Sequence, residues 1–385
     1  MTAEEGVRAY HRLSMHSPER FAPGPGQLDW ATQPAPFRHY GGARLIELWQ
    51  RPQEESPAYD AVFAAPLGEP APLDRASLAQ LLYDSLGLSA WKEAGGSRWA
   101  LRVNPSSGNL HPTEAYLLLP PGALEERGLL AHYAPDAHAL ELRGELPAPL
   151  GAQLAAALPA GGFLLALASI PWREAWKYGE RAYRYCQHDL GHALAGLAIA
   201  ASALGWQVRL LRGVAETRLD GLFGLDRDGF HEAEAVDALL WVGPPQAAEP
   251  PLPEALLNGL AALDPCGTPN RLSHHYRDWP ELARVQQLCR APALPSQPWA
   301  AEPGHAAADN PGLPLRPLLH RRRSAQAMDG KSGIKAELLL AWLRRLLPAN
   351  SPVPFAVSGE PPRVDLLLFV HRVQGLTPGL YWLAR

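Results

Sequence analysis

The segment from Arg181 to Gly205 constrains the fold more than any other part of the 385-residue chain. Its larger apolar residues recur at the spacing of one helical face, namely Leu190, Leu194, Leu197, Ala201 and Leu204. A second stripe consists of small residues, Ala193, Gly196, Ala200 and Ala203. A helix that is apolar on both sides is buried at the centre of a domain, and its small face lets another backbone approach closely. We place its C-cap at Gly205.

Shorter patterns predict a sheet and further helices around this central helix. Strands are predicted at 115–119 and at 163–168, a wholly apolar run that suits a buried strand. The polar turn His132–Asp136 separates two more strands of a meander. The spacing of four leucines predicts a helix at 77–88. The fold class is therefore expected to be α+β, with a mainly antiparallel sheet wrapped by helices.

The chain divides into four parts. Residues 1–70 are rich in proline and aromatic residues and are expected to wrap the surface of the first domain, 71–244. Proline recurs through 245–314, which we interpret as an ordered linker because runs of glycine and serine are absent. One short helix is predicted in this linker, at 279–288. The second domain is 315–385.

The second domain repeats part of the first. Its predicted helix at 337–347 and strand at 364–370 lead to a Gly-Leu pair and Tyr381, as a strand in the first domain leads to Gly-Leu and Tyr133. The first domain continues about 111 residues beyond its tyrosine (244 − 133), whereas four residues follow Tyr381 (385 − 381). We therefore expect an incomplete second repeat in a tandem arrangement, with exposed apolar surface that could lead to self-association.

A polar loop precedes the strand at 115–119. It contains Pro105, Ser106, Ser107, Gly108 and Asn109, whose hydroxyls, amide and backbone N–H groups are suited to the polar edge of a planar heterocycle. The other interpretation is a turn with a helix cap. Composition does not choose between a ligand loop and a simple turn.

This loop resembles the flavin-contacting loop of the nitroreductase superfamily, in the branch of SagB/ThcOx-type dehydrogenases. Three other segments carry the same resemblance, at 28–38, 176–185 and 374–381. The resemblance implies an α+β nitroreductase-like fold and bound FMN. Enzymes of this family are usually homodimers in which both chains contact each FMN.

The resemblance also implies that the flavin site is divided between the two repeats. Arg322, Arg323 and Ser324 resemble the segment that binds the FMN phosphate, and only the first repeat has the loop for the isoalloxazine ring. We therefore expect one composite FMN site per chain, built as a fused pseudo-dimer. Gln326 stands where many members have another basic residue. Without the resemblance, the arginines would be interpreted as a solvated basic cluster.

Lys177 and Tyr178 are the candidates for substrate chemistry. A Lys-Tyr pair in this motif is implicated in catalysis in the azoline-dehydrogenase branch, where lysine could act as a base and tyrosine could relay a proton. A packed aromatic residue beside a surface lysine is the alternative. His188 and His192 have an i, i+4 spacing that suits zinc, but no third ligand lies at a suitable offset, so no metal is expected.

The composition of the chain argues against some classes of binding partner. A formal charge of −4 gives no reason to expect nucleic acid or an anionic membrane. The three cysteines, Cys186, Cys266 and Cys289, fit free thiols in a reducing cytoplasm. No secretory signal is recognised and no apolar run is long enough to span a membrane.

The expected activity is FMN-dependent oxidoreduction by hydride transfer at flavin N5, in a ping-pong order. The substrate would be a small molecule or a peptide, with NAD(P)H as a candidate electron donor. Two alternatives stay open: an azoline dehydrogenase that acts on a modified peptide beside partner proteins, and a flavin-binding scaffold without turnover. The chain is expected to be a monomeric pseudo-dimer or a homodimer.

Overall fold

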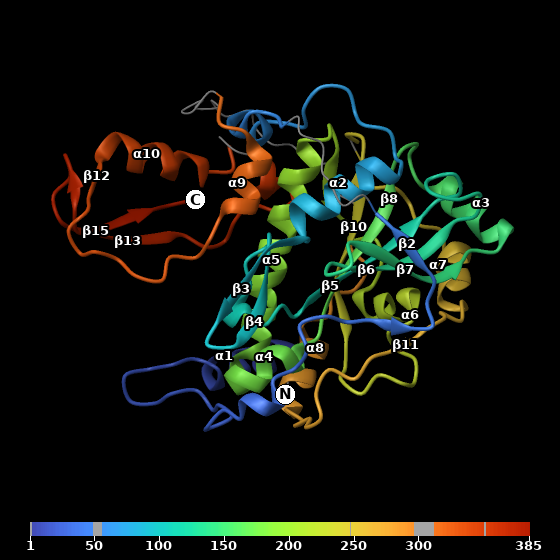
Figure 1. Cartoon of the computed structure of the whole chain (residues 1–385), viewed down its shortest axis with the longest axis horizontal. Coiled ribbons are helices and arrows are strands. Elements are labelled where there is room, and N and C mark those ends of the chain that lie inside the picture. The colour runs from blue at the N-terminus through green and yellow to red at the C-terminus, as the bar shows by residue number, and fades with distance from the viewer. Residues whose placement is uncertain (1, 49–55, 247, 296–311, 350–351) are drawn as a thin grey trace.

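The structure is a computed structural model that describes residues 2–48, 56–246, 248–295, 312–349 and 352–385. Its main body is an α+β domain around a seven-stranded sheet (Figure 1). All pairings in this sheet are antiparallel, and the strand order is β2-β7-β6-β5-β8-β10-β9. The strands are β2 (Leu45–Glu47), β5 (Thr113–Leu119), β6 (Leu129–Ala134), β7 (Ala139–Glu145), β8 (Phe163–Ser169), β9 (Gln207–Leu210) and β10 (Ala235–Gly243).

The sheet is buried on both faces, because helices cover each side. In β5, Leu117 faces a core formed with α2 (Arg75–Ser85) and α5 (Ala182–Ser202). Leu118 faces the opposite core, which is closed by α3 (Ala148–Ala157), α6 (Leu219–Phe223) and α7 (Glu254–Ala261). This two-sided burial explains why β5 and β8 read as continuous apolar runs. The predictions of strands at 115–119 and 163–168 are confirmed.

Helix α5 is the central helix that the two stripes predicted, although it ends at Ser202. Leu197 is fully buried in the core between α5 and the sheet. On the small face, a Cβ on Gly196 would lie 3.2 Å from the carbonyl oxygen of Ser85, at the end of α2. The small stripe therefore permits the close packing of α5 on α2. The C-cap is Ala203 and not Gly205 as predicted. Gly205 follows two residues later, with φ +71°.

Segments that precede and follow the first domain in sequence also belong to the main body. Helix α1 (Ala3–Leu13) packs on α8 (Pro280–Cys289), the helix predicted at 279–288. Strand β1 (Tyr40–Gly41) pairs with β11 (Thr268–Pro269). Helix α7 was not predicted, yet its leucines are buried in the core. The described part of the proline-rich segment, 245–295 without residue 247, thus contributes secondary structure to the body; residues 296–311 lie outside the described ranges.

The C-terminal elements form a smaller lobe that projects to one side (orange and red in Figure 1). It follows helix α9 (Leu315–Arg321) and contains α10 (Ala336–Arg345), β12 (Ile334–Lys335), β13 (Leu366–Val370), β14 (Val373–Gln374) and β15 (Gly379–Leu383). Helix α11 (Pro352–Phe355) instead packs on α5, and its Val353 belongs to the core of the body. Strands β13 and β15 pair antiparallel, as β5 and β6 do. The predicted helix and strand are confirmed as α10 and β13. Unlike β5 and β6, this hairpin exposes large apolar side chains, Leu367, Phe369, Leu380 and Trp382, each 69–72% exposed.

Gly205 and Gly191 provide a matched test of how α5 ends. A Cβ on Gly205 would lie 2.8 Å from the carbonyl oxygen of Glu69, at a positive φ, so Gly205→Ala should lower the free energy of unfolding by about 2 kcal/mol or more. Gly191 lies within α5, where an added Cβ would have open space around it, so Gly191→Ala should raise the free energy of unfolding by about 0.5–1 kcal/mol. Urea unfolding measures both. Equal effects would contradict this description of the helix end.

Candidate functional site

The polar loop connects β4 (Ser97–Arg102) to β5 and includes a short 3-10 turn, Ser107–Asn109. Three of its residues have positive φ: Gly108 at +61°, Asn109 at +61° and His111 at +52°. Glycine adopts this conformation freely, whereas it is uncommon for other residues, although asparagine and histidine adopt it more often than most. The surrounding protein must therefore hold the loop in this shape.

Hydrogen bonds within the protein hold the loop. The buried Asp189 carboxylate on α5 accepts from the Ser107 amide at 2.9 Å and from its hydroxyl at 3.0 Å. The His111 amide donates to Ser106 Oγ at 2.7 Å, and Asn109 Nδ2 donates to the Ala100 carbonyl at 2.9 Å. Ser106, Ser107 and Asn109, which were predicted to bond the flavin, thus form hydrogen bonds within the protein that hold the loop in shape. Asp189 was not predicted, because nothing in the sequence marks it as a partner of Ser107.

Helix α9 brings the arginine segment to this loop. The buried Asp84 carboxylate on α2 accepts from Arg316 Nε at 3.0 Å and from His320 Nε2 at 3.1 Å. The His320 ring also stacks on Tyr83, with 4.2 Å between ring centroids. At the end of α9, Arg322 Nη2 donates to the carbonyl of Val103 at 3.3 Å, although 219 positions separate them in sequence.

A cavity of about 680 Å³ lies where these elements meet. Asn104 and Pro105 line it from the loop, Gly196 from α5, and Arg322 from the end of α9. Ligand sites of small molecules usually have volumes of about 300–1,000 Å³. The remaining lining residues are mostly apolar: Tyr59, Phe63, Val103, His192, Ala195, Ile199, Leu318, Leu319 and Arg321. The lining includes neither Ser106–Asn109 nor Arg323 and Ser324. Arg323 and Ser324 directly follow Arg322 in sequence, and both are exposed to solvent.

The electrostatics of the cavity suit an anionic ligand with polar edges. Among the described residues, Arg321, Arg322 and Arg323 form no salt bridge. Partial burial of its guanidinium and the neighbouring Arg323 cation both lower the pKa of Arg322. An anion would relieve this repulsion. On the loop side, Asn104 lines the cavity, although its Oδ1 is buried and has no hydrogen-bond partner in the described ranges.

Lys177 and Tyr178 lie at the end of α4 (Pro171–Tyr178), against the loop. A Cβ on Gly108 would be 2.6 Å from the Tyr178 hydroxyl and 3.1 Å from Lys177 Nζ. Burial, followed by the nearby Glu174 carboxyl group, raises the pKa of Tyr178 to about 12. The phenol therefore stays protonated near neutral pH and can donate a proton. The structure brings this pair to Gly108, but neither residue lines the 680 Å³ cavity.

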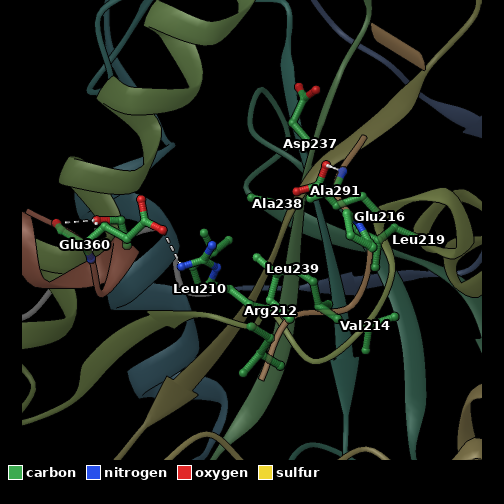
Figure 2. A pocket seen from close by; sticks show the side chains of 14 residues that line it. Leu210, Arg212, Val214, Glu216, Leu219, Asp237, Ala238, Leu239, Ala291 and Glu360 are labelled. Carbon is green, nitrogen blue, oxygen red and sulfur yellow. Dashed lines mark hydrogen bonds and ion pairs between the residues drawn. The ribbon is translucent and has the colours of Figure 1, made fainter. Parts of the chain in front are cut away.

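Two smaller cavities lie elsewhere. One, of about 170 Å³, is lined by residues from β9, β10 and the C-terminal lobe, with an Arg212–Glu360 ion pair at one side (Figure 2). The other, of about 210 Å³, borders Trp206 and Val353. Both are below the usual volume for a cofactor of nucleotide size.

The described ranges contain no helix that is long and apolar enough to cross a membrane. In the same part of the chain, no three His, Cys, Asp or Glu side chains gather as metal ligands. His192 instead faces Asp189, at 4.0 Å between Nδ1 and Oδ1.

Comparison with known families identifies the body of the protein. Residues 69–243 match the family model described as the nitroreductase family. This part of the chain is a nitroreductase-like domain. Its boundaries enclose the loop, α4, α5 and six of the seven strands of the main sheet. No curated protein matches the chain.

Solved structures support the same fold. A protein assigned as a nitroreductase from Anabaena variabilis ATCC 29413 is 24% identical, with a TM-score of 0.65, over 98% of this chain and 76% of that one. A second, from Ralstonia eutropha JMP134, is 18% identical with a TM-score of 0.39 (58% and 97% covered). The Escherichia coli microcin synthetase McbBCD complex with truncated pro-MccB17 is 18% identical with a TM-score of 0.36 (62% and 86% covered). The last two likenesses are too weak to carry an argument.

Alanine substitutions at Gly108 and Gly95 distinguish the destabilisation caused by the contact with α4 from that caused by a positive φ. Gly95 has φ +57° and open space around a Cβ, whereas a Cβ on Gly108 would meet Tyr178 and Lys177. Both alanine variants carry the left-handed penalty of about 1–2 kcal/mol. Gly108→Ala should cost roughly 1 kcal/mol more, because the added methyl overpacks the contact. Urea unfolding compares them, and equal losses would show that α4 does not press on Gly108.

Proposed function

We propose that this chain is an FMN-dependent oxidoreductase with a single flavin site between the loop and the arginine segment. The supporting observation is one cavity of about 680 Å³ with Asn104 and Pro105 on one side and Arg322 on the other. These residues belong to the two parts of the chain that the family resemblance assigns to opposite ends of FMN. The proposal includes one composite site per chain, in a tandem pseudo-dimer, and this arrangement of the lining residues supports it.

Each part of the site has a role that its chemistry suits. Arg322 and Arg323 would neutralise the phosphate through charge-assisted hydrogen bonds, and Ser324 would add a hydroxyl donor. Pro105 lines the cavity and would border the isoalloxazine ring, whereas Ser106, Ser107, Gly108 and Asn109 do not line the cavity and would support the loop. Because its hydroxyls already bond within the protein, we infer that they keep the loop rigid. Asn104 also lines the cavity, beside Pro105.

A bound FMN would supply hydride transfer, which no side chain can provide. We assign proton transfer to Lys177 and Tyr178, which contact the loop at Gly108. The raised pKa of Tyr178 keeps its phenol protonated near neutral pH, so the hydroxyl can donate a hydrogen bond. A small molecule or a peptide would be the substrate and NAD(P)H a candidate donor, each using the site in turn.

Titration with two flavins tests the proposal. We expect the purified chain to bind one FMN per chain. Arg322→Gln and Arg323→Gln should each weaken FMN binding roughly tenfold or more, because the phosphate loses a charge-assisted hydrogen bond. Riboflavin has no phosphate, so its affinity should be the same in all three proteins. Quenching of flavin fluorescence measures both affinities.

Arg363→Gln is the matched control, since Arg363 lies in the same lobe with a side chain 80% exposed. It should bind both flavins like the unmodified chain. A chain that binds neither flavin would favour a scaffold without a cofactor. Two FMN per chain would refute the composite site, and an equal loss of riboflavin affinity would show that the arginines act on the fold.

A further inference from the structure

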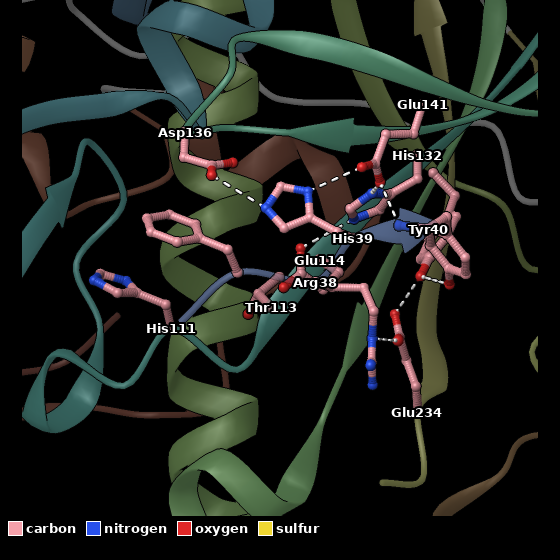
Figure 3. Close-up of polar contacts among 12 residues, drawn as sticks. Arg38, His39, Tyr40, His111, Thr113, Glu114, His132, Asp136, Glu141 and Glu234 are labelled. Atoms are coloured by element: carbon pink, nitrogen blue, oxygen red, sulfur yellow. Dashed lines mark hydrogen bonds and ion pairs between the residues drawn. The ribbon is translucent and has the colours of Figure 1, made fainter. Parts of the chain in front are cut away.

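A chain of alternating acidic and basic side chains runs through the body to the loop, and Figure 3 shows its part from Asp136 to Glu114. It begins at the surface, where His39 Nε2 lies 3.1 Å from Asp136. His39 Nδ1 then contacts Glu141 at 2.9 Å, and Glu141 contacts His132 Nδ1 at 2.9 Å. His132 Nε2 lies 3.2 Å from Glu114, and the other oxygen of Glu114 pairs with Arg173.

The inner part of this chain is removed from water. The side chains of His132 and Arg173 are 0% exposed and that of Glu114 is 1% exposed. Buried charges are stable only when they are paired, and here each charge has a partner of opposite sign. Burial alone would lower the pKa of His132, but hydrogen bonds to Glu114 and Glu141 outweigh it and raise the pKa. Both ring nitrogens face carboxylate oxygens, and only a protonated imidazole can donate a hydrogen bond from each of them.

Arg173 is the end of the chain that contacts the loop. Its Nη1 donates to the carbonyl of His111 at 2.7 Å, and its Nε donates to the carbonyl of Ala35 at 3.0 Å. His111 has a positive φ of +52°, a conformation that is uncommon for residues other than glycine. Asp189 secures the other end of the loop at Ser107. Arg173 thus fixes the point at which the backbone would otherwise relax.

We propose that Arg173, held by Glu114 and His132, is a positioning residue that sets the conformation of the loop and thereby the flavin site. The proposal rests on the proposed function for its effect on flavin. The claim that Arg173 restrains His111 does not depend on any cofactor. A lysine at this position would keep the charge but could not bond Glu114 and two carbonyls with the same planar group.

Substitution of Arg38 is a matched control, because it shows the effect of disturbing a buried ion pair that does not contact the loop. Its side chain is also 0% exposed and pairs with a buried glutamate, Glu234, at 3.2 Å. It bonds the backbone at Asn270 and has no hydrogen bond to the loop among the described residues. Replacing either arginine with lysine disturbs a buried ion pair, but only Arg173→Lys disturbs the restraint on His111.

The test compares Arg173→Lys with Arg38→Lys by amide hydrogen exchange and by FMN titration. In Arg173→Lys without flavin, the His111 amide should exchange about tenfold faster than in Arg38→Lys, while Leu117 in β5 exchanges equally in both. FMN affinity should fall about tenfold in Arg173→Lys and change less than about twofold in Arg38→Lys. The visible absorption bands of bound FMN should shift only in Arg173→Lys.

Equal exchange at His111 in the two variants would overturn the proposal. So would an unchanged FMN affinity in Arg173→Lys when the unmodified chain binds FMN. If the unmodified chain binds no FMN, the proposed function fails, and the exchange of His111 still decides whether Arg173 positions the loop. If Arg173→Lys does not fold, Glu114→Asp gives the same readouts, since it keeps the charge and retracts the partner of Arg173.

Discussion

The carboxylate of Asp84 joins the two parts of the candidate site. It is buried on α2, and it receives both Arg316 and His320 from α9. A buried carboxylate requires such partners, because an unpaired charge in the interior is strongly destabilising. The position of α9 is therefore determined by the body of the protein, and the position of Arg322 follows from α9. Together with the burial of Leu315 against Val62 and Phe63, this contact places the arginine segment beside a loop about 219 positions away in sequence.

The loop depends on the same kind of restraint from within the body. Its positive φ values at Asn109 and His111 are unfavourable by themselves, so the local sequence does not fix its shape. Asp189 on α5 and Arg173 on α4 provide the compensating hydrogen bonds. A site held in this way is formed before its ligand arrives, which limits the loss of conformational entropy on binding.

Local sequence patterns predicted the elements whose burial is regular. The two stripes of α5 and the apolar runs of β5 and β8 each reflect packing on both sides, so periodicity was sufficient. Helix α7 was missed because prolines at 250–253 resemble a linker, although Pro253 is the N-cap of this helix. Proline is compatible with the start of a helix and does not exclude one.

The site was predictable only in part. Resemblance to a family indicated the loop and the arginine segment, and the structure brings Asn104, Pro105 and Arg322 to one cavity. The engagement of Ser107 by Asp189, and the contact of Lys177 and Tyr178 with Gly108, depend on the packing of α4 and α5 on the loop. No local pattern encodes such contacts between distant segments.

The composite site requires that both segments hold one ligand at once. Hydrogen–deuterium exchange with and without FMN tests this requirement most directly. We predict that FMN slows exchange in residues 104–111 and in 318–324 together, at a single FMN concentration. Protection of only one segment, or protection around the Arg212–Glu360 cavity instead, would contradict the composite site.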